Sequence, residues 1–116
     1  MQEEMNPVFD AVARYFALMS DPTRLRILHA VCNGERSVSE IVEHTGGTQT
    51  NISRHLNLMH ERGALARRKD GSLVFYRVAD KALIAMCRDV CQRVSEAQEV
   101  KPTLREGLRN MIDEFS

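Results

Sequence analysis

A mainly α-helical domain carrying one small β-hairpin is the fold class that this sequence of 116 residues predicts. Apolar residues recur at helical spacing in both the first and the last third of the chain. Between them, two strand-like runs flank Asp70-Gly71, a strong signal for a hairpin. A Gly46-Gly47 turn separates two helical segments just upstream. Helix, glycine turn, helix and hairpin in this order predict a winged helix-turn-helix.

The first half of the chain predicts three helices. Residues 7–19 carry their apolar side chains on one helical stripe. A second helix begins after Asp21, a favourable N-cap, with Pro22 at its first position. A third begins after Ser37, and Glu40 follows at the spacing of a capping box.

The helix after the glycine turn has a polar tip and an apolar back. Thr48 is placed to cap it, while Ile52 and Leu56 lie on the side that a core would bury. Beyond the hairpin, a second apolar stripe predicts a long helix. Thr103 and Glu106 have capping-box spacing, so we expect a final amphipathic helix to begin there.

Length and composition limit the class of protein. A chain of this size holds one core, and 43% hydrophobic with 28% charged residues is typical of a globular domain. Charged residues interrupt the apolar runs, so we expect no membrane-spanning segment. The acidic start lacks the pattern of a signal peptide. Three cysteines, an odd number, favour free thiols in a reducing compartment, and we expect a cytoplasmic protein.

The net charge is zero, but the charges are unevenly distributed along the chain. Residues 48–77 hold six cations and two anions, a net charge of +4. Residues 1–47 and 78–116 carry −3 and −1. A basic patch confined to one region is expected where one face of a protein meets the phosphates of nucleic acid. A solvated charged surface is the alternative.

The tip of the helix that begins after residue 48 carries side chains suited to the major groove of DNA. Glutamine can pair with adenine, arginine can pair with guanine, and the threonine methyl group can contact thymine. A threonine cap and the free amides of the first turn also suit a phosphate. The residues predicted to contact DNA are Thr48, Gln49, Thr50, Ser53, Arg54 and His55. For His55, contact with DNA and simple packing are equal alternatives.

The predicted hairpin adds basic side chains that do not read sequence. Arg67, Arg68 and Lys69 are candidates for contacts with the DNA backbone. Strand alternation places Arg67 and Lys69 on one face and Arg68 on the other, so not all three need contact DNA. Protection of a sheet edge from pairing is the alternative role for these cations.

Five separated motifs follow one another in a specific order. They are Asp21-Pro22-Thr23-Arg24-Leu25-Arg26-Ile27-Leu28, Gly34-Glu35, Thr48-Gln49-Thr50-Asn51-Ile52-Ser53-Arg54-His55-Leu56, Gly63-Ala64-Leu65 and the hairpin from Arg68-Lys69-Asp70-Gly71 to Tyr76-Arg77. In these motifs the chain resembles the ArsR/SmtB family of bacterial repressors. The resemblance covers residues 16–94.

The resemblance implies a homodimer formed by the first helix and the long helix after the wing. It also implies that the dimer binds double-stranded operator DNA by default and that an inducer releases it. On this basis residues 1–116 form one winged helix-turn-helix domain. Residues 1–19 are expected to dimerise, 20–78 to form the DNA-binding core and wing, and 79–116 to form dimerisation and tail helices.

Two other classes of function compete with a DNA-binding regulator. A winged helix can serve as a protein-interaction module without DNA binding, although such modules commonly lose the basic wing that this sequence retains. A thiol enzyme would need a Cys-His-acid set or a redox Cys-x-x-Cys motif, and the sequence has neither in convincing form. We therefore expect no enzymatic activity.

The metal sites that the resemblance implies are mostly missing. The arsenite-type site needs two cysteines in the helix before the polar-tipped one that begins after residue 48. In that region this chain has Ser37 and Ser39. The zinc-type site pairs carboxylates with histidines on the long helix after the wing. Asp80 and Glu96 match the carboxylates, but no histidine stands at the other positions. Because carboxylates without imidazole are poor zinc ligands, we expect no zinc site there.

Cys32, Cys87 and Cys91 remain as candidate sensor or metal-binding residues. Cys87 and Cys91 lie one helical turn apart and are close enough to share a soft ion. The resemblance adds a thiol switch that senses persulfides or oxidants, and a three-thiolate site for arsenite or a soft metal. All three cysteines also continue apolar stripes, so inert buried thiols are the third interpretation. If the thiols sense an inducer, Cys32→Ser is expected to abolish the response.

Overall fold

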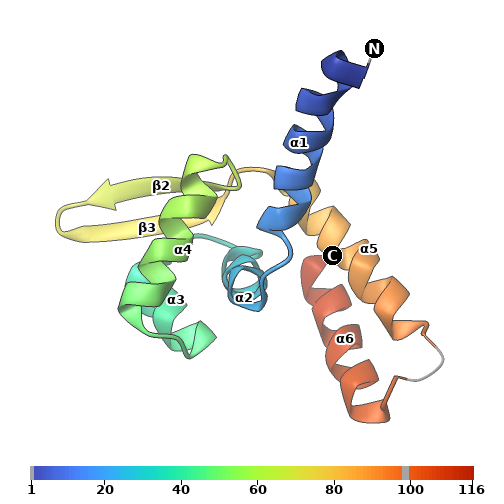
Figure 1. The fold of residues 1–116 in the computed structure, drawn as a ribbon. Helices are drawn as coiled ribbons and strands as arrows, with labels where there is room; N and C mark the ends of the chain where they lie inside the picture. The colour runs from blue at the N-terminus through green and yellow to red at the C-terminus, as the bar shows by residue number, and fades with distance from the viewer. Residues whose placement is uncertain (1, 98–99) are drawn as a thin grey trace.

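A computed structural model describes residues 2–97 and 100–116 and confirms the mainly helical fold with its hairpin (Figure 1). In chain order the elements are α1 (Gln2–Leu18), α2 (Pro22–Val31), β1 (Arg36–Ser37), α3 (Val38–Thr45), α4 (Gln49–Glu61), β2 (Leu65–Asp70), β3 (Leu73–Val78), α5 (Lys81–Ser95) and α6 (Pro102–Phe115). The expectation of a dimerisation segment over residues 1–19 includes Met1, which lies outside the described residues. None of the described helices is both long and apolar enough to cross a membrane.

The elements form a flattened molecule of 47 × 46 × 23 Å. The helix-turn-helix pair α3–α4 and the hairpin β2–β3 lie on one side, and α5 with α6 lies on the other (Figure 1). Helix α1 projects away from the body, while α6 packs against α5 and ends beside α2. The chain therefore separates a polar-tipped helix and wing from a second group of helices.

The core lies where α2, α3 and α4 meet the small sheet. Ile27 and Leu28 of α2 and Ile41 of α3 are fully buried there. Ile52 and Leu56 of α4 are also fully buried, as the apolar back of that helix predicts. Burial of side chains of this size stabilises by about 1.5–3 kcal/mol each, so α4 is held rigidly from behind.

The sheet contains three strands in the order β1-β3-β2, all antiparallel. The short strand β1 was not predicted, because two residues are too few to show an alternating pattern. The hairpin turn also differs from the expectation. Asp70 pairs with Leu73, so the two turn residues are Gly71 and Ser72 rather than Asp70 and Gly71. Gly71 has φ +62°, a conformation that glycine adopts without steric cost.

Glycine suits both positions of the turn between α3 and α4. Gly46 ends α3 with φ +74° in the left-handed region. At Gly47 an added Cβ would lie 2.9 Å from Cδ1 of Ile52, so the chain passes close to the buried start of α4. These two positions let α4 follow α3 at once and still reach the core.

Three of the predicted helix starts are confirmed. The side chains of Asp21, Ser37 and Thr48 each accept a hydrogen bond from a backbone amide at the start of α2, α3 and α4. The expected capping box at Thr103 is wrong, because α6 begins at Pro102 with Lys101 as N-cap and no side-chain cap. Helix α1 begins at Gln2, five residues before the apolar stripe, since the polar residues of its first turns carry no periodic signal.

Replacing Ser37 by alanine is expected to destabilise the domain by about 1 kcal/mol. In α3 the hydroxyl of Ser37 accepts a hydrogen bond from the amide of Glu40, and the carboxylate of Glu40 accepts one from the amide of Ser37. Alanine removes the first of these bonds and exposes an unpaired amide. Urea unfolding measures the change in stability. The control is Ser39→Ala, the same substitution two residues later at a position that does not cap the helix.

Candidate nucleic-acid interface

The exposed tip of α4 is the first part of the candidate interface. Gln49, Thr50 and Arg54 are exposed, whereas the opposite side of the helix is buried. The Arg54 guanidinium donates a hydrogen bond of 2.6 Å to Oδ1 of Asn51, which holds it along the helix. The hydroxyl oxygen of Thr48 accepts from the amide of Asn51, and its proton stays free to donate. The tip thus presents several donors on a rigid support.

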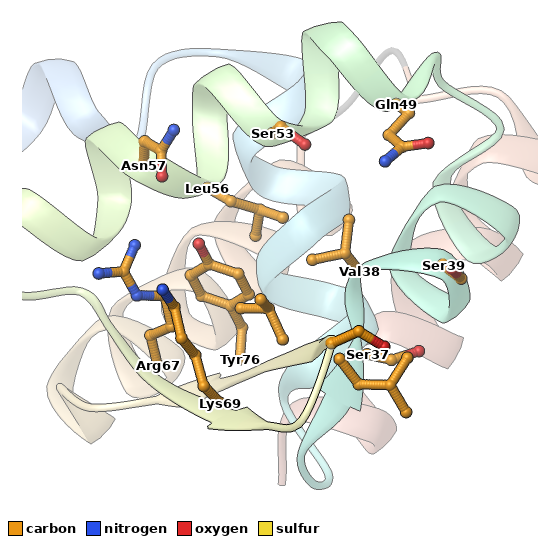
Figure 2. A pocket seen from close by; sticks show the side chains of 13 residues that line it. Ser37, Val38, Ser39, Gln49, Ser53, Leu56, Asn57, Arg67, Lys69 and Tyr76 are labelled. Atoms are coloured by element: carbon orange, nitrogen blue, oxygen red, sulfur yellow. The ribbon is translucent and has the colours of Figure 1, made fainter.

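A groove of about 420 Å³ runs between α4 and the wing. On the helix side, Gln49, Ser53 and Asn57 follow one another at one-turn spacing and face the groove (Figure 2). Arg67 and Lys69 reach toward it from β2. The groove therefore has uncharged hydrogen-bonding groups along one wall and two cations along the other.

The three basic residues of the wing divide between its two faces, as strand alternation predicts. Arg68 points away from the groove and forms a two-pronged ion pair with Glu35, with N–O distances of 2.6–3.2 Å. Its guanidinium also lies 4.5 Å from the centre of the Phe75 ring. These contacts hold Arg68 against the base of the wing. Contacts of Arg67, Arg68 and Lys69 with DNA stay predictions, and the ion pair with Glu35 makes Arg68 the least available of the three.

His55 is partly buried and contacts Arg24 of α2, so it does not lie at the exposed tip of α4. Its Nδ1 lies 3.4 Å from Nη1 of Arg24, and an arginine can only donate, so Nδ1 is the acceptor. Partial burial lowers the pKa of His55, although the nearby carboxylate of Asp21 opposes the shift. In the neutral ring, this contact places the proton on Nε2. Whether Nε2 also reaches DNA stays a prediction.

Arg24 connects three elements that sequence reasoning did not link. Its Nε donates to the carbonyl of Leu18 at 2.7 Å, and its Nη2 donates to the carbonyl of Ala17 at 2.8 Å. Both carbonyls lie at the end of α1, while His55 belongs to α4. One side chain of α2 thus fastens α1 to α4.

The three cysteines do not gather at one point. Cys87 and Cys91 are buried on α5 and line one cavity, whereas Cys32 is half-buried and lines another. Phe115 of α6 borders both cavities. Within residues 2–97 and 100–116, no three side chains of His, Cys, Asp or Glu come together as a metal site.

The comparison with protein families identifies the helix-turn-helix region. Residues 21–65, from the start of α2 to the start of β2, match the model of the arsR family of bacterial regulatory proteins. A second match extends the likeness beyond this region: the HTH-type transcriptional regulator Rv0081 of Mycobacterium tuberculosis is 34% identical over 109 residues, which are 90% of this chain and 96% of that protein. The chain belongs to the ArsR family. It is a winged helix-turn-helix regulator of transcription that binds DNA.

Other ArsR-family relatives agree in sequence and in fold. A probable mercury resistance operon repressor of Streptomyces lividans is 40% identical over 83 residues, 67% of this chain and 66% of its own length. The crystal structure of Rv0081 superposes with a TM-score of 0.70 at 31% identity, covering 77% of this chain and 93% of that one. The homodimeric DNA-binding domain Mb0332 of Mycobacterium bovis gives a TM-score of 0.68 at 27% identity, covering 82% and 92%.

Asp80, which the sequence resemblance aligned with one carboxylate of a zinc-type site, makes two structural contacts in this chain. Asp80 caps α5 by accepting a hydrogen bond from the amide of Ala82 through Oδ1. Its other oxygen, Oδ2, accepts a hydrogen bond of 2.8 Å from the hydroxyl of Tyr15 on α1. This bond and the negative charge of Asp80 raise the pKa of Tyr15. The carboxylate therefore joins α1 to the start of α5.

One group of residues in the interface lacked a clear sequence signal. Asn57 lines the groove two turns beyond Gln49, and its position four residues after Ser53 was the only hint. The Arg68–Glu35 pair spans 33 positions, and the Arg24–His55 contact spans 31. Separations of this size are fixed by the tertiary fold and leave no local pattern.

Alkylation of Cys87 at neutral pH is expected to be about 100-fold slower than in the unfolded chain. Burial, with a smaller effect of neighbouring Cys91, raises the pKa of the Cys87 thiol to about 11, and only the thiolate reacts. A raised pKa leaves less thiolate at pH 7, so the rate should increase about tenfold for each pH unit up to that value. Iodoacetamide labelling followed by mass spectrometry measures the alkylation rate of Cys87. Equal rates for the folded and urea-unfolded chain would contradict the burial.

Proposed function

We propose that the chain acts as a homodimeric repressor that holds operator DNA until an inducer releases it. The groove between α4 and the wing supports this most directly. Its helix wall carries Gln49, Ser53 and Asn57, which can bond base edges, and its strand wall carries Arg67 and Lys69, which can meet phosphates. In this arrangement α4 enters the major groove and the wing follows the backbone.

The exposed end of α4 would read sequence while its surroundings position it. Gln49, Thr50 and Arg54 are exposed and stand at the N-terminal turns of the helix, where side chains reach base edges. The hydroxyl of Thr48 and the free amides beside it would donate hydrogen bonds to a phosphate at the helix N-terminus. His55, held by Arg24, would keep the helix oriented toward α1.

Dimerisation would use the apolar surface that one copy leaves exposed. On α1 the exposed apolar residues are Met5, Val8, Phe9, Val12, Tyr15 and Phe16. Val90 and Val94 extend this surface onto α5. Large apolar residues this numerous on one side of a small protein mark an interaction surface. A second copy placed there would set the distance between two recognition helices, which must match half-sites about 34 Å apart.

Selection of binding sites from a random duplex library tests the proposal. The full chain is expected to enrich a two-fold symmetric sequence, and its affinity for that sequence should fall steeply with added salt. Gln49→Ala should relax the preference at one base pair in each half-site, at a cost of about 1–3 kcal/mol. Gln92→Ala, the same change on the exposed side of α5, is the matched control. No enrichment, even at low salt, would instead favour a module that binds protein.

The two cysteines of α5 offer one candidate for the inducer, a soft metal ion. Cys87 and Cys91 line the same cavity one turn apart, a spacing that two thiolates could use to share a soft ion. The name of the mercury resistance relative makes mercury a reasonable probe. If such an ion or an oxidant is the inducer, it should lower DNA affinity in the parent chain. Cys87→Ser, Cys91→Ser and Cys32→Ser then identify which thiols carry the response.

A further inference from the structure

A half-open apolar cavity lies where α1 and α5, the helices proposed to dimerise, meet α2 and α6. Its volume is about 150 Å³. The residues that line it are Phe16, Met19, Leu25, Met86, Cys87, Val90, Cys91, Met111 and Phe115. They come from α1 and the turn after it, from α2, from α5 and from α6. The cavity therefore touches both the group of helices that would dimerise and the last helix of the chain.

The chemistry of the lining selects neutral apolar molecules. None of the nine side chains carries an oxygen or a nitrogen atom, so a charged or strongly hydrated ligand would lose its water without receiving hydrogen bonds in return. The two thiols do not change this. Burial raises the pKa of both Cys87 and Cys91, which keeps them uncharged at neutral pH. Here they act as small apolar groups.

The size of the cavity limits the occupant further. An engineered and enclosed apolar cavity of about 150 Å³ in another protein stays free of water and accepts benzene or xenon. A single aromatic ring or an aliphatic group of similar bulk would fill this one. Phe16 and Val90 stand at its exposed side, at 59% and 58% exposure, and the proposed dimer partner would cover both.

We propose that this cavity is a binding site for one small, neutral, apolar molecule of about the size of a benzene ring. The ligand would lie between α5 and α6, in contact with Met86 of one helix and Met111 and Phe115 of the other. Burial of its apolar surface supplies the binding free energy. No covalent bond and no metal are involved.

The wall formed by α6 connects the cavity to the DNA-binding helices. Glu114, next to Phe115, pairs with the Nε2 atom of His29 on α2. The His29 ring packs edge-on against the rings of Phe115 and of His44 on α3. The distances between ring centres are 6.0 Å to Phe115 and 5.3 Å to His44. A ligand that displaces Phe115 would act on α2 and α3 through these rings. This link to DNA release rests on the proposed function, and so does closure of the exposed side of the cavity by a dimer partner. Contact of the ligand with α5 and α6 within one copy does not rest on it.

Methyl NMR of the full chain, labelled with ¹³C at its methionine methyl groups, tests the binding without DNA. Benzene is the probe. Met19, Met86 and Met111 line the cavity, whereas Met59 lies on the buried side of α4 and Met5 lies near the start of α1. Saturable shifts are expected at the three lining methyl groups. Shifts of equal size at Met59 and Met5, a response that never saturates, or no response would overturn the proposal.

Two variants separate binding in the cavity from binding elsewhere. Cys91→Leu enlarges a lining side chain and is expected to weaken benzene binding by about tenfold or more, because the ring would overlap the added atoms. Cys32→Leu makes the same change outside the cavity and should leave the affinity unchanged. If Cys91→Leu does not fold by circular dichroism, Met86→Phe replaces it. Parent-like affinity in a folded filling variant contradicts the site.

A failed DNA experiment does not affect these outcomes, because the protein alone is titrated. Conversely, a chain that binds a selected operator but shows no methyl response would keep its proposed function and lose the cavity site. If mercury shifts the lining methyl groups while benzene does not, the ligand is a soft ion and the apolar site is wrong.

Discussion

Replacing Arg67 and Lys69 together by alanine is expected to weaken DNA binding by about 2 kcal/mol, roughly 30-fold, with little dependence on sequence. The two side chains extend from β2 into the groove opposite α4, where phosphates would lie. Each lost phosphate contact also releases one fewer counterion, so the slope of log affinity against log salt should become shallower by about 2. Fluorescence anisotropy with a labelled duplex at several salt concentrations measures both quantities.

Arg68→Ala is the matched control for this experiment. It removes one cation from the same strand, but from the face that carries the ion pair with Glu35. We expect its salt slope to stay close to that of the parent chain. A slope that falls by about 1 in Arg68→Ala and stays unchanged in the double variant would reverse the assignment of the two faces.

The division of the wing shows how far sequence reasoning reaches. Alternation along a strand is a local rule, so it separated Arg67 and Lys69 from Arg68 without a structure. The partner of Arg68 is Glu35, in the loop before β1, and a strand of two residues gave no signal that this loop joins the sheet. The local periodicity was predictable, and the tertiary contact was not.

The same limit applies to the helices and the thiols. Caps at Asp21, Ser37 and Thr48 depend on neighbours within three residues and could be predicted. The stripe on α5 correctly placed Cys87 and Cys91 on one buried face. That Phe115 of α6 would lie between their cavity and the one beside Cys32 depends on how α6 folds back, which no local pattern encodes.

Replacing Arg24 by alanine is expected to lower the free energy of unfolding by about 2–3 kcal/mol. Its guanidinium donates to the carbonyls of Ala17 and Leu18 at the C-terminal end of α1, where a positive charge also interacts favourably with the helix dipole. Alanine leaves both carbonyls without this donor and removes the contact with Nδ1 of His55. Urea unfolding measures the loss of stability.

Two further variants distinguish this fastening from a general effect of charge. Arg26→Ala removes a cation from an exposed position two residues away on α2 and should change stability by less than about 0.5 kcal/mol. Arg24→Lys keeps the charge but loses the planar fork that reaches several acceptors at once, so it should recover only part of the stability. Equal stability of Arg24→Ala and Arg26→Ala would refute the role given to Arg24.

Hydrogen exchange locates the effect of Arg24 within the molecule. If Arg24 fastens α1 to α4, its loss should speed amide exchange in the last turn of α1 and in α4 around His55 more than in α6. Because α1 carries most of the surface proposed for dimerisation, a looser joint would also uncouple the two recognition helices of a dimer. DNA affinity should then fall, although Arg24 lies behind α4 and not in the groove. The affinity for an isolated half-site should fall less than the affinity for the full symmetric site.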